Sequence, residues 1–488
     1  MRISYIVNAI SLIMMYIGLV LVAPAIVALY YHDLNSVFPF ISAAVISAGT
    51  GYLMRKIVPS SAQLENLNDI KKSEGLFIVA FSWIIFALIS AIPYPFFNLS
   101  IINSIFEATS GITTTGATIL THFDYPKAFF FWRSLTQWIG GMGIIIMFIA
   151  VLPQFAVAGR QMFFAEAPGP TEDKFTPRVR NTASTLWKLY LGMTIVLIIL
   201  LKITGMPLFD SVCNAFSTMS AGGFSPHAHS IMGYQIPAAT IIITIFMLLA
   251  GTSFNLQYKA FQQKNPLVLF KDEEFRVYFF AIIILTLLVA FPLLFVNYYE
   301  FGDAIRHAVF QVVSLMTSSG FASSDYTNWA YSAQIMLVLA MIISSCSSSA
   351  GGGIKIARLL LIFKILKNEI SKVLHPNAVI PVKHNDKAIS TEVLRQVIIF
   401  AFQYLIIFGV SAIAVTLIEH NHTIGFTSTF AAIGNIGPAF GQIGPMGSFD
   451  SLQISTKVIL TINMLVGRLE LIPFIVMLNP EFWNFKND

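Results

Sequence analysis

The chain has 488 residues, of which 56% are hydrophobic and only 11% are charged, with a net charge of +5. Soluble domains carry about 25% charged residues, so the composition excludes a soluble globular protein and indicates a chain that crosses a membrane several times. The basic residues lie between apolar runs, which argues against a nucleic-acid-binding domain and points to membrane topology.

Apolar segments suited to crossing a membrane follow one another along the whole chain. A crossing takes about 20 apolar residues. Ten segments meet or approach that length, and the eighth continues raggedly to residue 366. They are 3–31, 37–58, 75–97, 129–157, 186–203, 236–256, 277–296, 331–343, 396–418 and 454–478.

Shorter apolar runs follow the third, fifth, seventh and ninth spans; segments 101–110 and 426–433 are two of them. Runs of roughly ten residues are too short to cross and too apolar for a loop, which predicts re-entrant half-helices. Each run ends in a stretch rich in Gly, Ser or Thr. These stretches are 113–118, 220–225, 318–322 and 435–439, and their key glycines, Gly116, Gly222, Gly320 and Gly437, recur roughly every hundred residues.

The predicted fold is all-α. Two N-terminal transmembrane helices (1–70) precede four membrane–pore-loop–membrane repeats (71–160, 161–262, 263–375 and 376–488) around a pseudo-four-fold pore. All but six of the 29 Lys and Arg residues fall in segments on one side of this topology. The positive-inside rule therefore predicts cytoplasmic termini and re-entrant loops that enter from outside. The polar inner loops 158–185 and 367–395 are either docking surfaces for a cytosolic partner or solvated linkers.

The four glycine stretches suit a cation filter. Backbone carbonyls can replace the water around a cation without a full counter-charge, so the ion can leave again. Non-helical backbone at membrane depth persists only where it is buried or lines a watery cavity. Glycine permits the dihedral angles that turn carbonyls inward. One such stretch could simply pack helices, but four at equivalent positions favour a filter.

Four motifs carry a family resemblance. They are Gly-Ile-Thr-Thr-Thr-Gly-Ala-Thr at 111–118, Arg-Ser-Leu-Thr-Gln-Trp-Ile-Gly-Gly-Met-Gly at 133–143, Ala-Gly-Gly-Gly-Ile-Lys at 350–355 and Gly-Arg-Leu-Glu at 467–470. In these motifs the chain resembles the Trk/Ktr/HKT superfamily of potassium transporters, and its two additional N-terminal helices make it more similar to the TrkH/TrkG branch. The resemblance implies a homodimer with one pore per subunit in the bacterial inner membrane. It also implies a cytosolic, TrkA-type nucleotide-binding ring as partner.

The same resemblance assigns the potassium-binding residues by position. It implies that the filter carbonyls come from Thr114, Thr115 and Gly116, from Ser220, Ala221 and Gly222, from Ser318, Ser319 and Gly320, and from Asn435, Ile436 and Gly437.

The eighth span is interrupted at 344–353, Ser-Ser-Cys-Ser-Ser-Ser-Ala-Gly-Gly-Gly. Serine and glycine disfavour a helix, so we expect a flexible intramembrane gate loop that includes Gly351, Gly352 and Gly353. A small-residue contact face between helices is the alternative. Lys355, at the end of this segment, is a further gate candidate or simply the first cytoplasmic lysine.

Arg468 lies within the last predicted span. An intramembrane charge is expensive and usually faces a cavity or a partner. We expect Arg468 to point into the pore below the filter and to contact carbonyls or hydroxyls of segment 344–353. A structural pair with a carboxylate on another helix is the alternative.

The sequence thus predicts potassium uptake through a carbonyl-lined filter, with K⁺ as the transported ion and no organic cofactor. An ion-coupled secondary symporter of a small substrate is the alternative, but such proteins usually contain inverted repeats. No catalytic constellation stands out, which argues against an enzyme. The two cysteines, Cys213 and Cys346, are more than a hundred residues apart and form neither a disulfide framework nor a zinc motif.

Overall fold

A computed structural model of the chain describes residues 3–58, 72–146, 176–376, 380–469, 471, 477 and 479–480. The fold of these residues is helical, as the sequence predicts. Two short strands, β1 (Lys383–His384) and β2 (Lys387–Ala388), form an antiparallel hairpin that is the only sheet within the described ranges.

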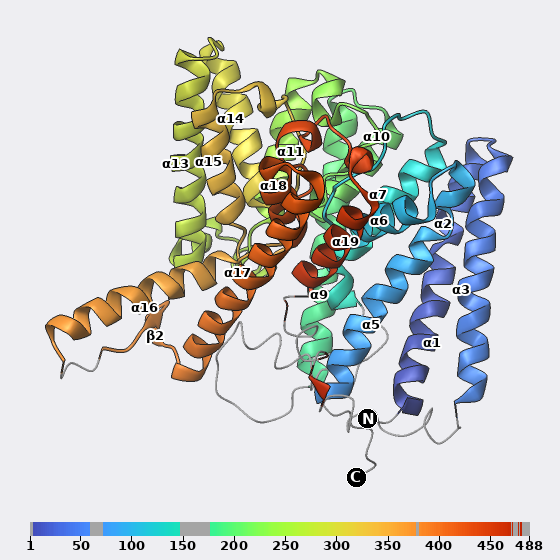
Figure 1. The fold of residues 1–488 in the computed structure, drawn as a ribbon, viewed down its shortest axis with the longest axis horizontal. Coiled ribbons are helices and arrows are strands. Elements are labelled where there is room, and N and C mark those ends of the chain that lie inside the picture. Colours follow the sequence, from blue (N-terminus) through green and yellow to red (C-terminus); the bar gives the residue numbers. More distant parts are fainter. Residues whose placement is uncertain are drawn as a thin grey trace.

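The N-terminal part is a pair of packed helical spans. Helices α1 (Ile3–Val20) and α2 (Val22–Tyr30) make one apolar span, and α3 (Val37–Ile57) returns alongside α1 (Figure 1). Small residues let the two backbones approach: a Cβ on Gly51 would lie 2.7 Å from the Ser11 carbonyl oxygen.

Four helix–half-helix–helix units follow. The first contains α5 (Lys72–Ala91), α6 (Ile101–Ile112) and α7 (Lys127–Ile146), and the second α9 (Thr176–Ile203), α10 (Leu208–Met219), α11 (Pro237–Ala250) and α12 (Phe254–Gln262). The third contains α13 (Glu273–Phe295), α14 (Phe301–Met316), α15 (Tyr331–Ile342) and α16 (Ile356–Leu374), and the fourth α17 (Thr391–Glu419), α18 (His422–Ile433) and α19 (Ile454–Arg468). Short 3₁₀ turns occupy Leu34–Ser36, Tyr94–Phe97, Ser230–Tyr234, Pro266–Lys271, Tyr326–Asn328, Gly441–Ile443 and Phe449–Ser451.

The predicted half-helices are α6, α10, α14 and α18. They have 12, 12, 16 and 12 residues, too few to cross a bilayer. All four lie in the upper half of Figure 1. Side-chain caps fix the start of two of them: Ser100 accepts a hydrogen bond from the Asn103 amide, and Asn421 accepts from the Thr423 and Ile424 amides.

The spans differ in part from the ten that the sequence predicts. Among the described residues, six helices are long and apolar enough to cross a membrane. The predicted spans 129–157 and 454–478 extend beyond the described residues. Helix α15 ends at Ile342, and the next helix begins only at Ile356, so the eighth span is broken as expected.

The sixth predicted span, 236–256, is not straight. Helix α11 ends at Ala250, and α12 continues at an angle of 100° to it. Gln257 explains why the bend is tolerated, because its side-chain amide donates to the carbonyls of Leu249 (2.7 Å) and Thr252 (2.9 Å). These bonds satisfy carbonyls that a broken helix leaves without their usual partners.

The structure describes the two predicted inner loops to different extents. Most of 158–185 lies outside the described residues. Segment 367–395 contains the end of α16, the β1–β2 hairpin and the start of α17, and α16 extends away from the body of the molecule (Figure 1). Within the third unit, an ion pair between Lys364 of α16 and Glu273 of α13 (2.6 Å) joins these two helices.

The α1–α3 contact can be tested with two neighbouring glycines. We expect Gly51→Ala to destabilise the protein by about 1–3 kcal/mol, because the new methyl group would overlap the α1 backbone. Gly49→Ala is the matched control, since no atom lies within 4 Å of the Cβ position there. Thermal unfolding in detergent measures both, and equal melting temperatures would contradict the packing described here.

Candidate functional site

The four glycine stretches share one backbone conformation. One residue after the cap of each half-helix, a non-glycine residue has a φ of 51–56°, and two residues later a glycine has a φ of 73–98°. The first set is Thr114, Ala221, Ser318 and Asn435, and the second is Gly116, Gly223, Gly320 and Gly437. The units are therefore equivalent residue by residue.

This equivalence shifts the register that the sequence predicts in the second unit. Ala221, Gly222 and Gly223 correspond to Thr114–Gly116, one residue later than the predicted set of Ser220, Ala221 and Gly222. Ser220 is instead the C-cap of its half-helix, as Thr113, Thr317 and Gly434 are of theirs. Gly222 and Gly223 are adjacent, and only the structure shows that Gly223 is the one with a positive φ.

The four stretches meet in a closed ring. A Cβ on each left-handed glycine would lie less than 3.0 Å from a carbonyl oxygen of the next unit. The pairs are Gly116 with Gly222, Gly223 with Ser319, Gly320 with Ile436, and Gly437 with Thr115. The fourth unit thus contacts the first, and the order around the ring follows the order along the chain. A side chain at any of these glycines would collide with backbone and strain it as well.

Polar side chains hold the ring at two junctions. Gln137 of α7 donates to the Gly222 carbonyl (2.7 Å) and accepts from the Phe224 amide (3.0 Å), which joins the first and second units. Asn435 donates to the Thr115 hydroxyl (3.0 Å) and to the Met464 carbonyl (2.9 Å), which joins the fourth unit to the first.

Hydroxyl pairs stiffen two of the four stretches. The hydroxyls of Thr113 and Thr115 lie 2.7 Å apart, and those of Thr317 and Ser319 lie 2.9 Å apart. The second and fourth stretches have Gly222 and Ile436 at the position of Thr115. The ring therefore presents equivalent carbonyls but unequal side chains.

A buried ion pair supports the first two stretches. Glu107 of α6 and Arg133 of α7 are 2.8 Å apart, and their side chains are 0% and 2% exposed. Glu107 also accepts from the Thr118 hydroxyl and the Ile119 amide, while Arg133 donates to the Thr118 hydroxyl (3.1 Å) and the Ser225 carbonyl (3.4 Å).

This pair is not among the functional residues predicted from the sequence, where Arg133 belongs to a resemblance motif and Glu107 has no role. The available signal was one acid inside an apolar half-helix and one base in the next span. Charges at such depth need each other.

A second set of hydrogen bonds links neighbouring units just beyond the four glycine stretches. The Phe449 amide donates to the Thr118 carbonyl (2.9 Å), and the Met232 amide donates to the Ala322 carbonyl (3.0 Å). The Tyr326 hydroxyl donates to the Ala439 carbonyl (3.0 Å). With the Arg133–Ser225 bond, every pair of neighbouring units is bridged.

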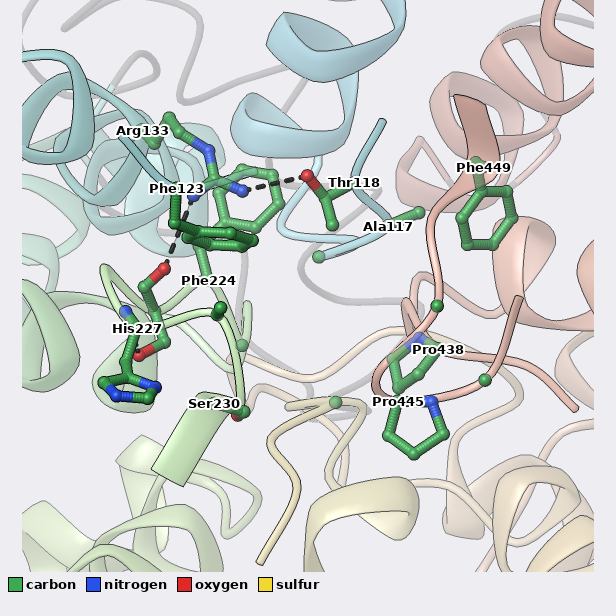
Figure 2. Close-up of a pocket in the computed structure, with 17 residues that line it drawn as sticks. Ala117, Thr118, Phe123, Arg133, Phe224, His227, Ser230, Pro438, Pro445 and Phe449 are labelled. Carbon is green, nitrogen blue, oxygen red and sulfur yellow. Dashed lines mark hydrogen bonds between the residues drawn. The ribbon is translucent and has the colours of Figure 1, made fainter. Parts of the chain in front are cut away.

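A cavity of about 60 Å³ opens beside the ring and is lined by residues of all four units. Figure 2 shows Arg133 on one wall, reaching towards Thr118, with Pro438 and Pro445 on another. Burial and the neighbouring His229 lower the pKa of His227 in this lining, which favours the neutral imidazole.

The electrostatics of the ring favour a cation. The C-terminal ends of all four half-helices lead into it, and the C-terminus of a helix carries partial negative charge. Carbonyl and hydroxyl oxygens are the available ligands. The described residues contain no cluster of three or more His, Cys, Asp or Glu side chains suited to a metal ion.

The segment 344–353, which we call the gate loop, lies against the third and fourth stretches. The Gly352 amide donates to the Ser318 hydroxyl (2.6 Å). A Cβ on Gly351 would lie 2.7 Å from the Thr317 carbonyl oxygen, and one on Gly352 would lie 2.5 Å from that of Gly434. The loop is not helical, so the alternative of a helix contact face is wrong. Gly353, the last residue of the loop, has a left-handed φ of 71°.

Both predicted gate cations contact this loop. Arg468 donates to the Ala350 carbonyl (3.0 Å) and to the Gly140 carbonyl of α7 (2.9 Å), so the predicted contact with the loop is confirmed. Lys355 is 6% exposed and donates to the Gly351 carbonyl and the Ser345 hydroxyl, the latter at 3.3 Å. It is therefore not a solvated cytoplasmic lysine.

Comparisons with known proteins assign the chain to a family. The family model TrkH, described as a cation transport protein, matches residues 50–484. The chain belongs to the TrkH family. It is 34% identical to the Trk system potassium uptake protein TrkH of Salmonella typhimurium, over 99% of this chain and 100% of that one. It is 33% identical to the Trk system potassium uptake protein TrkG of Escherichia coli, over 96% of each chain.

The fold matches a solved family structure as well. The crystal structure of the potassium transporter TrkH from Vibrio parahaemolyticus aligns with a TM-score of 0.89, at 30% identity, over 99% of this chain and 100% of that one. The relatives are potassium transporters, not enzymes, and this chain is accordingly a multi-pass membrane protein of the transporter class.

The buried ion pair gives a stability prediction. We expect Glu107→Ala to cost about 3–5 kcal/mol, because it leaves the Arg133 guanidinium buried without its carboxylate. Asp303→Ala is the matched control: its partner Arg306 is 31% exposed, and such a pair contributes at most about 1 kcal/mol. Unfolding in detergent measures both, and similar losses would contradict the importance of the buried pair.

Proposed function

We propose that this protein takes up potassium ions through the ring formed by its four glycine stretches. The observation that carries the proposal is the closed ring in which Thr115, Gly222, Ser319 and Ile436 present carbonyls at equivalent positions. Four sets of carbonyls can replace the water of a dehydrated cation. The relatives' description as potassium uptake proteins gives the identity of the ion.

The proposed filter keeps the predicted residues with the second stretch moved by one. It consists of Thr114, Thr115 and Gly116, of Ala221, Gly222 and Gly223, of Ser318, Ser319 and Gly320, and of Asn435, Ile436 and Gly437. Potassium is the cargo, and the site requires no organic cofactor.

We assign gating to the loop that contains Gly351, Gly352 and Gly353. Its contact with Ser318 and its attachment to Lys355 and Arg468 support this role, because an ion leaving the ring on that side meets the loop first. The two cations hold loop carbonyls and raise the electrostatic barrier to another cation. Opening requires these bonds to break or exchange.

The setting of the pore is also a proposal. We place both termini in the cytoplasm and the ring towards the outside of a bacterial inner membrane, since the basic segments lie opposite the half-helices. The four repeats are taken as 71–160, 161–262, 263–375 and 376–488. A homodimer and a cytosolic nucleotide-binding ring complete the assembly, with segments 158–185 and 367–395 as docking surfaces.

Ion flux tests the filter. We expect K⁺ and Rb⁺ to enter proteoliposomes faster than Na⁺, and Gly223→Ala to lower K⁺ flux at least about tenfold, because a methyl group there meets the Ser319 carbonyl. Gly302→Ala is the control, since its Cβ position is open. The wild-type protein should also rescue a potassium-uptake-deficient bacterium on low potassium. Equal K⁺ and Na⁺ flux, or no rescue with the partner co-expressed, would count against a potassium filter.

The gate is tested separately. We expect Arg468→Ala to raise K⁺ flux about tenfold, because it removes the hydrogen bonds that hold the loop and α7 together and removes a positive charge. Arg306→Ala, on the partly exposed side of α14, serves as control. Single-channel recording or proteoliposome flux measures the change, and an unchanged or lower flux would contradict the barrier role of Arg468.

A further inference from the structure

Glu274 is a buried carboxylate that the proposed function does not use. It lies in the first turn of α13 and is 7% exposed. Its Oε1 accepts hydrogen bonds from the Ser347 amide (2.6 Å) and the Ala357 amide (3.1 Å). Ser347 is inside the gate loop, and Ala357 is in the first turn of α16. One oxygen atom therefore holds both the loop and the helix that follows it.

Two features of the contact between Glu274 and these amides stabilise it. Two amides donate to one buried carboxyl oxygen, and losing that oxygen would leave both amides without a partner. The N-terminus of α16 also attracts negative charge, because its first amides lack helical partners. A buried carboxylate without such donors would be very unfavourable, so the loop and Glu274 stabilise each other's placement.

Main-chain bonds fasten the same part of the loop on its other side. The Cys346 amide donates to the Gly251 carbonyl (2.9 Å), the Ala350 amide donates to the Ala250 carbonyl (3.0 Å), and the Phe254 amide donates to the Ser348 carbonyl (3.1 Å). All three partners lie at the 100° bend between α11 and α12. The loop is therefore held between this bend and Glu274.

We propose that Glu274 is a positioning residue that latches the gate loop in its closed placement. Its carboxylate fixes Ser347 and Ala357 relative to each other, so the loop cannot leave the third and fourth filter stretches while α16 stays in place. The inference adds a residue to the gate assigned above and rests on that assignment only for its effect on ion flux. Release of the loop itself is measurable without any ion.

The native cysteines report that release. Cys346 lies beside Ser347 in the loop and is 1% exposed, whereas Cys213 is buried in α10. They are the only cysteines in the chain. Labelling the full-length protein in nanodiscs with a maleimide, followed by mass spectrometry of the two peptides, gives both rates from one sample. Loop release exposes Cys346 alone, whereas general unfolding exposes both.

We expect Glu274→Ala to accelerate labelling of Cys346 at least about tenfold and to leave Cys213 protected, because the hydrogen bonds from Ser347 and Ala357 are both lost. Glu274→Gln, which keeps an acceptor oxygen, should show a smaller increase. Asp272→Asn is the charge control: it removes a neighbouring carboxylate that does not bond to the loop, and asparagine can still cap α13 at the Phe275 amide. In Asp272→Asn, the labelling rate of Cys346 should stay within about twofold of wild type.

Two results would overturn the latch. One is a Cys346 rate in Glu274→Ala within twofold of wild type. The other is equal acceleration at both cysteines, which would make Glu274 a general stabilising residue. Potassium flux separates this proposal from the gate: faster Cys346 labelling with higher flux supports both, and faster labelling with unchanged flux supports the latch while contradicting the gate assigned to the loop.

Discussion

The structure depends on one repeated contact, in which a left-handed glycine of each unit lies against a carbonyl of the next. The contact requires the absence of a side chain, because even one carbon atom would collide with backbone. It also requires the half-helices to end at a common depth, since each glycine follows its cap by a fixed number of residues. The lengths of α6, α10 and α18, the placement of α14 and the ring itself are therefore parts of one geometric constraint.

Polar groups inside this apolar protein are concentrated where they maintain that contact. Glu107, Arg133, Gln137 and Asn435 are all buried, and each joins elements of different units or supports the stretch next to them. Such groups are expensive in a bilayer unless their partners enclose them. Their uneven distribution means that four equivalent backbones are held by four different sets of side chains.

Much of this architecture can be predicted from the sequence, and the features that cannot be predicted escape for identifiable physical reasons. Segment length distinguishes half-helices from spans, and the serine-glycine run reveals the broken eighth span. The predicted residues of the second stretch differ by one position from those with the shared backbone conformation, because Gly222 and Gly223 are adjacent and chemically identical. The bend after Ala250 is hidden because Gly251–Ser253 is short and the flanking residues are apolar. The Glu107–Arg133 pair and the hydrogen bonds that two amides donate to Glu274 become visible only when distant segments are brought together in space.

The contact between Gly437 and Thr115 has a consequence for biosynthesis. It joins residues more than 300 positions apart, and the Asn435–Thr115 hydrogen bond accompanies it. Because the order around the ring follows the order along the chain, the ring closes only where the fourth unit meets the first. A nascent or truncated chain that lacks the fourth unit therefore cannot form the complete ring of carbonyls.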